Sequence, residues 1–147
     1  MTTWIRGFSG NDRLIGGFGD DVLQGDDGDD TLIGGFGADT MTGGLGSDVF
    51  AYKNSGDSGE QSADRITDFS QAEGDKIDLS SLGFFDFDGE IRFSFSGGNT
   101  VLEVDTLGGF NFPLILRLTG EIRADRSRLH SLAVIYRSPG RRPSTKK

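Results

Sequence analysis

The sequence predicts an all-β fold, with a parallel β-roll over residues 7–51 followed by an antiparallel β cap over 52–136. A nine-residue glycine and aspartate repeat predicts the roll, and alternating apolar and polar residues between glycine turns predict the cap. The chain has 147 residues with 24 glycines, 3 prolines and no cysteine, which fits one elongated module without disulfides. We therefore expect a single module over 1–147, with a flexible basic tail at 137–147.

Five nonapeptides follow one another without a gap, and they begin at Gly7, Gly16, Gly25, Gly34 and Gly43. The first and fourth positions are always glycine, the sixth is always aspartate and the eighth is always large and apolar. The eighth-position residues are Leu14, Leu23, Leu32, Met41 and Phe50. Glycine permits positive φ, so the first six residues of a repeat should form a tight turn and the last three a short strand. Because two repeats make one coil, the eighth-position residues should meet between two facing sheets.

Turns two repeats apart should stack, which brings the sixth-position aspartates together in pairs such as Asp12 with Asp30 and Asp21 with Asp39. At about 4.8 Å and an effective dielectric near 20, two such carboxylates repel by about 3 kcal/mol. A divalent cation between them reverses the sign. Carboxylate and carbonyl oxygens without nitrogen or sulfur ligands are typical of calcium sites, so calcium is the predicted cofactor, with several ions bound.

The pattern GGxGxDxUx, found five times, resembles the RTX repeat, whose members form parallel β-rolls with calcium between the turns. A disordered glycine- and aspartate-rich linker is the alternative interpretation. Five matches in register favour the roll, and the linker describes the metal-free state.

The resemblance implies three calcium sites, each made by the carbonyls and aspartates of two stacked turns. The first would contain Phe8, Gly10, Asp12, Gly25, Asp27 and Asp30. The second would contain Gly17, Gly19, Asp21, Gly34, Phe36 and Asp39. The third would contain Asp26, Gly28, Asp30, Gly43, Leu45 and Asp48. Asp26 departs from the pattern, because it replaces the second glycine of its repeat.

The segment after the repeats is similar to the corresponding part of serralysin-type proteases and of the R-modules of bacterial mannuronan epimerases. IDLSSLGF at 77–84 is closer to the epimerase modules. Asp57 and Asp64 either complete a terminal calcium site with the last turn around Asp48 or are ordinary solvated loop acids. Three further acids are interpreted as turn and capping residues, namely Asp68, Asp75 and Asp78.

Residues 91–118 are expected to form antiparallel strands, with turns at 97–99 and 108–109 and a last strand at 132–136. We expect the apolar residues of this half to form the true hydrophobic core, packed against the end of the roll, although an exposed aromatic platform for sugar rings is an alternative. The apolar face of the third strand comprises Phe112, Leu114, Leu116 and Leu118.

Charge is distributed unevenly, because residues 1–90 hold 19 acidic and 5 basic side chains whereas 115–147 hold 9 basic and 2 acidic ones. The basic region suggests binding of an anionic polysaccharide such as alginate through Arg117, Arg123, Arg126 and Arg128. His130 is the only histidine and no GxSxG turn is present, so we expect no catalytic site. The net charge of −8 and the lack of a long apolar stretch indicate no nucleic-acid partner and no membrane insertion.

These observations predict a calcium-binding accessory module of a secreted alginate-modifying epimerase. The module would pass unfolded through a type I exporter, fold on extracellular calcium and assist the catalytic domain of its host. The alternative is the C-terminal export and folding domain of a serralysin-type secreted protease.

Overall fold

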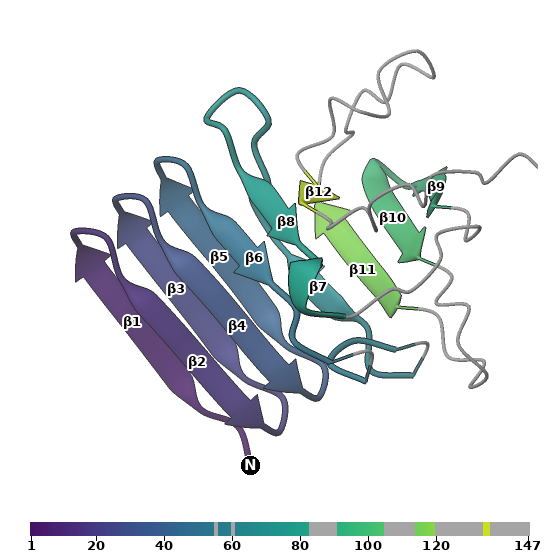
Figure 1. Ribbon diagram of the computed structural model, residues 1–147, viewed down its shortest axis with the longest axis horizontal. Coiled ribbons are helices and arrows are strands. Elements are labelled where there is room, and N and C mark those ends of the chain that lie inside the picture. The colour runs from purple at the N-terminus through teal and green to yellow at the C-terminus, as the bar shows by residue number, and fades with distance from the viewer. Residues whose placement is uncertain (55, 60, 83–90, 105–113, 120–133, 136–147) are drawn as a thin grey trace, which may run out of the picture.

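The computed structural model describes the chain except for residues 55, 60, 83–90, 105–113, 120–133 and 136–147. The described residues form two facing sheets, shown in Figure 1. One has seven strands in the order β1-β3-β5-β7-β11-β10-β9, and the other has five in the order β12-β8-β6-β4-β2. The prediction of an all-β roll with an antiparallel cap is confirmed. No helix in the described part of the chain is long and apolar enough to cross a membrane.

The roll strands alternate between the two sheets, and each pairs in parallel with the strand one coil later. They are β1 (Trp4–Ser9), β2 (Arg13–Phe18), β3 (Val22–Asp27), β4 (Thr31–Phe36), β5 (Thr40–Leu45) and β6 (Val49–Ala51). Leu14 pairs with Leu32 and Leu23 with Met41, which confirms that two repeats make one coil. The expected three-residue strands are wrong for all but β6, because pairing continues through the first three positions of the next repeat, as at Gly17 with Gly35.

The roll continues after the repeats through two short strands, β7 (Asp64–Ile66) and β8 (Lys76–Asp78), followed by the 3-10 helix η1 (Ser80–Leu82). They pair in parallel with β5 and β6, so that Ile66 lies beside Met41 and Ile77 beside Phe50. The nonapeptide region therefore gains a further coil, which two loops interrupt.

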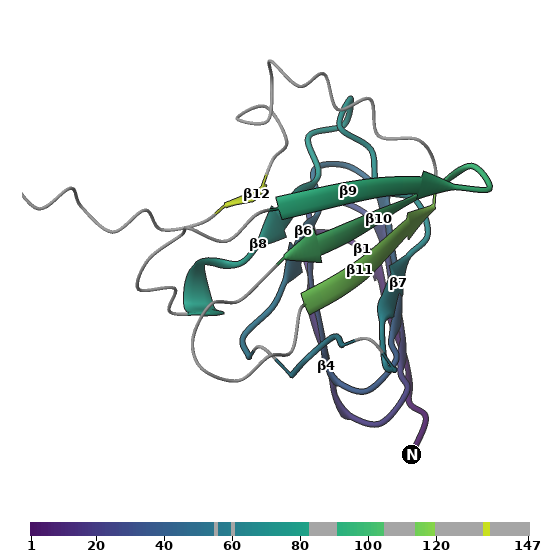
Figure 2. The same ribbon diagram turned by 90° about the vertical axis from the view of Figure 1, so that its right-hand side faces the viewer.

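The cap contains β9 (Ile91–Ser96), β10 (Asn99–Val104), β11 (Leu114–Thr119) and the short β12 (Val134–Ile135). β9, β10 and β11 pair antiparallel, and β11 pairs in parallel with β7, which joins the cap to the seven-stranded sheet. Figure 2 shows these three strands across the end of the roll. Gly97 and Gly98, with φ of 60° and 77°, make the first predicted turn. The turn at 108–109, residues 132, 133 and 136 and the tail lie outside the described residues.

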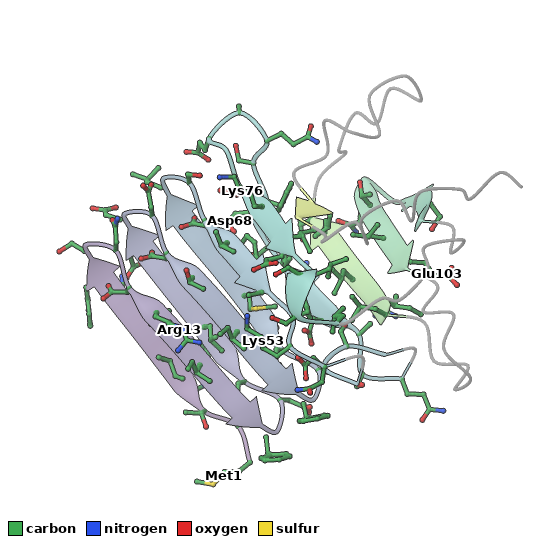
Figure 3. All side chains as sticks on the ribbon, in the orientation of Figure 1. Met1, Arg13, Lys53, Asp68, Lys76 and Glu103 are labelled. Carbon is green, nitrogen blue, oxygen red and sulfur yellow. The ribbon has the colours of Figure 1, made fainter. Side chains whose placement is uncertain are left out.

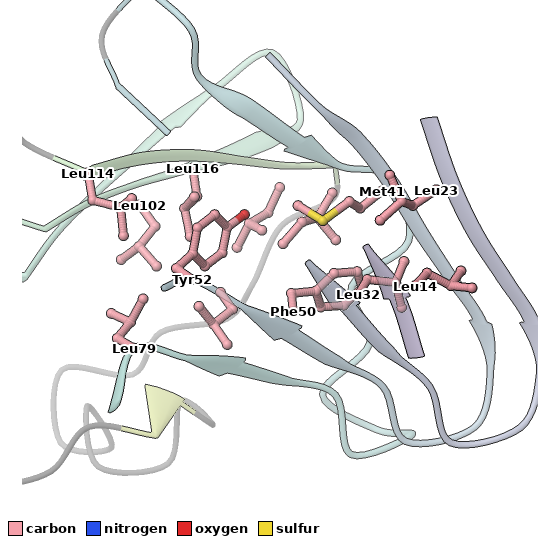
Figure 4. Packing of buried hydrophobic residues seen from close by; sticks show 13 residues of the cluster. Leu14, Leu23, Leu32, Met41, Phe50, Tyr52, Leu79, Leu102, Leu114 and Leu116 are labelled. Atoms are coloured by element: carbon pink, nitrogen blue, oxygen red, sulfur yellow. The ribbon is translucent and has the colours of Figure 1, made fainter. Parts of the chain in front are cut away.

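One hydrophobic core runs through the roll into the cap (Figure 4). The eighth-position residues are all buried, from Leu14 at 7% exposed to Leu23, Leu32 and Phe50 at 0%. Tyr52 lies at the junction, between these residues and the cap. The cap contributes buried residues at Leu102, Leu114, Leu116 and Leu118. Phe112 lies outside the described residues. Among the residues that the structure describes, exposed aromatic rings occur on the roll, at Phe8, Phe18 and Phe36.

Candidate metal centres

The sixth-position aspartates form two columns, one along each side of the roll. Asp30 Oδ1 accepts a hydrogen bond from the backbone N–H of Asp12 at 2.7 Å, 18 residues earlier. Asp48 Oδ1 accepts in the same way from Asp30 N–H at 2.9 Å. On the other side, Asp39 Oδ1 accepts from Asp21 N–H at 2.8 Å. One carboxylate oxygen of each pair therefore fixes the stacking of two turns and leaves the other oxygen available.

The second carboxylate oxygens are buried and have no hydrogen-bonding partner. The set comprises Oδ2 of Asp12, Asp21, Asp30, Asp39, Asp48 and Asp64. A buried polar atom without a partner loses its hydration without compensation, and native proteins contain few such atoms. Six such oxygens in regular columns indicate that a bound ligand replaces their lost hydration. Because they are carboxylate oxygens, that ligand is expected to be a cation.

The first-position glycines show where the orphan oxygens point. A Cβ added to Gly7 would lie 2.7 Å from Asp12 Oδ2 and 2.8 Å from the carbonyl oxygen of Gly25. A Cβ added to Gly16 would lie 2.7 Å from Asp21 Oδ2 and 2.5 Å from the carbonyl oxygen of Gly34. Each carboxylate thus converges with a carbonyl from two repeats later, in a space that a side chain would fill. The same arrangement recurs at Gly25, beside Asp30 Oδ2 and the carbonyl oxygen of Gly43. The polar atoms nearest to each of these positions are oxygens, which fits calcium.

The second and fourth positions hold the left-handed backbone that shapes each turn. Gly10, Gly17, Gly19 and Gly28 have φ between 110° and 134°. Two second positions lack glycine, and there Phe8 and Asp26 adopt φ of 76° and 77°, which strains an L-residue.

The Asp26 carboxylate is held outside the aspartate columns. It accepts hydrogen bonds from Arg6 and, at 2.6 Å, from Gln24 Nε2, and the Arg6 guanidinium also lies over the Phe8 ring. The hydrogen bond from Arg6 lowers the pKa of Asp26. Only the backbone carbonyl of Asp26 remains as the predicted ligand. The third-position residues Asp27, Phe36 and Leu45 end their strands with exposed side chains, which is compatible with ligation through carbonyl oxygens.

Asp64 and Asp75 occupy the sixth-position place in the additional coil. Asp64 Oδ1 accepts from Asp39 N–H at 2.9 Å, and Asp75 Oδ1 accepts from Asp48 N–H at 3.0 Å. The expectation that Asp64 reaches the turn around Asp48 is wrong, because the turn carrying Asp64 stacks on the Asp39 side. Asp75 takes the place beside Asp48, so the predicted turn and capping role is only part of what this residue does. The triplets Asp64-Arg65-Ile66 and Asp75-Lys76-Ile77 repeat the spacing between the aspartate and the apolar residue of the nonapeptides. This spacing is the feature of the sequence that indicates the additional coil.

Three other acids cap backbone groups. Asp57 is buried, and its Oδ2 accepts from the N–H groups of Lys53 and Asn54 at 2.8 and 2.9 Å, which closes its own loop. It is therefore neither a solvated acid nor joined to the Asp48 turn. Asp68 accepts from Gly43 and Gly44 N–H, and Asp78 accepts from Ser80 N–H. Asp75 combines both roles, because its Oδ2 accepts from Ser70 N–H at 2.7 Å.

Burial makes the aspartate columns costly without a cation. Burial first, and then the charges of neighbouring carboxylates, raises the pKa of Asp39 and of Asp48 to about 6. The same causes raise the pKa of Asp64 to about 8. Burial, followed by the charge of Asp64, also raises the pKa of Tyr52, whose hydroxyl is buried. The ends of both aspartate columns next to the cap thus hold carboxylates that are shielded from water.

No group of three acidic, histidine or cysteine side chains in the described part of the chain is placed to hold one ion. This agrees with sites that each use two carboxylates and complete their coordination with carbonyl oxygens. Of the predicted polysaccharide ligands, Arg117 is exposed on β11, whereas Arg123, Arg126 and Arg128 lie outside the described residues.

Residues 6–41 and 15–50 match the family described as RTX calcium-binding nonapeptide repeat (4 copies). The chain is similar in structure to the AlgE6R3 subunit of the mannuronan C5-epimerase of Azotobacter vinelandii, with a TM-score of 0.70 and 28% identity over 91% of this chain and 78% of that one. It is also similar to the AlgE6R2 subunit of that epimerase, with a TM-score of 0.63 and 28% identity over 92% of this chain and 93% of that one. No curated protein sequence matches the chain. Residues 6–50 therefore consist of RTX repeats, which bind calcium ions, and the predicted cofactor and resemblance are confirmed.

Proposed function

We propose that this chain is a non-catalytic, calcium-dependent accessory module of a secreted alginate-modifying epimerase, and that it binds the anionic polysaccharide on its seven-stranded sheet. Its similarity to two subunits of a mannuronan C5-epimerase supports the enzyme class. The binding face rests on one observation, a pair of exposed arginines on neighbouring strands. The catalytic domain of the host is then the partner that the module assists.

Arg65 and Arg117 are register partners on β7 and β11. Their neighbours Asp64, Ile66, Leu116 and Leu118 are buried, so both arginine side chains project from the outer face of the sheet. Like charges directly opposite each other destabilise a sheet. Arg65 Nε lies 3.5 Å from Thr119 Oγ1, and no ion pair to either arginine occurs among the described residues. A carboxylate-bearing sugar polymer would compensate this pair.

Bound calcium makes the rest of the surface compatible with a polyanion. Three calcium ions would take the formal charge of −8 to about −2, by neutralising the acidic columns and leaving the arginines unpaired. The aspartate columns lie inside the turns, whereas Arg65 and Arg117 lie on the sheet face. A long anionic chain can therefore cross the face without contacting the aspartate columns.

Secretion is supported by the same electrostatics. Extracellular calcium modules bind with dissociation constants of about 0.1–1 mM, far above cytosolic calcium concentrations. Without the ions, the buried carboxylates oppose the closed roll, which favours an extended chain suited to export. Outside the cell, calcium would supply the missing charge and drive folding.

Titration with alginate oligomers at saturating calcium tests the binding face. The double variant Arg65→Gln with Arg117→Gln should bind at least tenfold more weakly than the wild type, and wild-type affinity should fall steeply as salt rises. Arg13→Gln with Lys76→Gln is the matched control, because it removes the same charge from the five-stranded sheet and should leave binding unchanged. Equally weakened alginate binding by both double variants would show that net charge, and not this face, determines the affinity. No binding by the wild type would favour the export and folding domain of a protease.

A further inference from the structure

The end of the roll nearest the N-terminus has two open sheet edges. β1 and β2 are the outermost strands of the two sheets, and each pairs on one side only (Figure 1). Both are six residues long and contain no proline. Figure 3 shows Met1 and Arg13 at this end, and Glu103 at the opposite, capped end. Long unprotected edges of this kind are ready to pair with another strand.

The hydrophobic core is also open at this end. Leu14 on β2 is the most exposed of the eighth-position residues, and Ile5 on β1 is only partly buried, whereas Leu23 and Leu32 one layer further in are at 0% exposure. Trp4 and Phe18 on the same two strands are 78% and 82% exposed. An additional layer would bury the apolar residues that face it.

Residues 1–6 follow the path of the last six positions of a nonapeptide. Thr3 N–H donates to Asp21 Oδ1 at 2.7 Å, and its carbonyl accepts from Val22 N–H at 2.8 Å. Asp12 makes the same two contacts one repeat later, with Asp30 and Thr31. Met1 lies against Gly19 as Gly10 lies against Gly28. The coil geometry therefore extends to Met1, although Thr3 stands where an aspartate would be.

Asp12 has a stacked turn on one side only, although it has the acceptors for a second one. Asp21, Asp30, Asp39 and Asp48 each accept a backbone N–H from one coil earlier, but no described residue donates to Asp12 Oδ1. Its Oδ2 points instead towards the carbonyl oxygen of Gly25, in the site shared with the later turn. A turn stacked before Asp12 would supply both the missing N–H and an opposing carboxylate.

We infer that the open end formed by β1, β2 and Asp12 is a docking face for one further parallel coil of nonapeptide repeats. The occupant is a repeat-bearing roll segment with its own open last coil, because only that geometry continues both sheets and completes the Asp12 site. A second copy of this chain does not offer an open coil of repeats at its other end, where the outermost described strands are β9 and β12 of the cap.

An extended chain tests this inference. A copy of residues 25–36 placed directly before Met1 would provide one aspartate turn and a strand of β4 sequence, in frame with residues 1–6. We expect the extended chain to bind one more calcium ion than the parent by calorimetry and to unfold at a higher temperature in calcium. Amide hydrogens of β2 should exchange at least tenfold more slowly.

The matched control carries Asp30→Asn in the copied segment only, and it should lose the extra ion. Circular dichroism verifies that the parent portion stays folded in each chain. Unchanged calcium stoichiometry together with unchanged exchange at β2 would overturn the inference. Calcium-dependent dimers of the parent in sedimentation, with protection at β1 and β2, would also overturn it and assign the face to self-association. Neither result depends on alginate binding, so the two proposals fail separately.

Discussion

Replacing Asp30 with asparagine removes one charge from the middle of an aspartate column and keeps the side-chain oxygen that accepts from Asp12 N–H. Asp30 also donates its own N–H to Asp48 Oδ1, so its turn lies between two others. Asp12 has a stacked neighbour on one side only. If the ions lie between stacked turns, Asp30 belongs to two sites and Asp12 to one.

Ligand linkage gives the size of the effect. With dissociation constants of about 0.1–1 mM and about 10 mM free calcium, each site stabilises the fold by about 1.4–2.7 kcal/mol. Asp30→Asn should therefore cost about 3–5 kcal/mol in calcium, and Asp12→Asn about half as much. In chelator the sign reverses, because removing a carboxylate about 5 Å from its neighbours relieves about 3 kcal/mol of repulsion for each pair.

Calcium stoichiometry by calorimetry and thermal unfolding, with and without a chelator, measure both quantities. Asp29→Asn is the charge-matched control, because Asp29 is an exposed fifth-position residue whose Oδ1 accepts from Ser47 N–H. It should change neither the number of ions nor the calcium dependence of stability. Equal losses from Asp30→Asn and Asp12→Asn would refute ions shared between stacked turns, and an equal loss from Asp29→Asn would reduce the effect to net charge.

Three further outcomes follow from the same geometry. Chelation should remove most of the β signal of residues 7–51 in circular dichroism, and calcium should restore it; an identical spectrum for the calcium-free protein would contradict the dependence. Gly25→Ala should lower the free energy of unfolding in calcium by at least about 2 kcal/mol, because the added Cβ would clash with Asp30 Oδ2 and the Gly43 carbonyl oxygen. The control Gly59→Ala should be nearly neutral, because the nearest atom to its Cβ is Ser62 Oγ at 3.7 Å. In chelator, residual folded protein should become more stable as pH falls from about 8 towards 4. The pKa values of Asp39 and Asp48 (about 6) and of Asp64 (about 8) lie above the ordinary value of 3.8, so the folded chain binds protons more tightly than the unfolded chain. A higher unfolding temperature at pH 7.5 than at pH 5.5 would contradict this.

The roll was predictable because one physical rule recurs at a fixed spacing. A period of nine with an apolar eighth position determines which side chains lie inside, and all five of these residues are buried. The same period determines that Asp12 stacks on Asp30 and Asp21 on Asp39. Strand length was not predictable in this way. The glycines at the start of each repeat were expected to end the strand, but pairing continues through left-handed glycines such as Gly17, which pairs with Gly35.

The additional coil escaped prediction because loops break the period. Asp64 stacks on Asp39 across 25 residues and Asp75 stacks on Asp48 across 27, instead of the 18 that separate partners within the repeats. A search for registered nonapeptides therefore stops at Phe50, although the aspartate-to-apolar triplets continue. Arg65 was missed for the same reason, since a residue of an unrecognised strand has no assigned face. The arginine predictions instead came from charge density near the C-terminus.

The strand β7 links the two proposed sites, because it carries Asp64 on its buried face and Arg65 on its exposed face. Burial raises the pKa of Asp64 to about 8, so docking β7 with an ionised Asp64 is costly until a cation compensates the charge. Docking of β7 is also what aligns Arg65 with Arg117 on β11. Calcium and polysaccharide should then favour the same docked strand, and by linkage each should raise the affinity of the other by the same factor.

Calorimetric titration of calcium with and without saturating alginate oligomers measures one side of this cycle, and oligomer titration at low and high calcium measures the other. Because free alginate itself binds calcium, the Arg65→Gln with Arg117→Gln variant is the reference for both titrations. An oligomer affinity that stays constant while calcium occupancy changes would show that β7 is docked without its ion, and would separate the two sites.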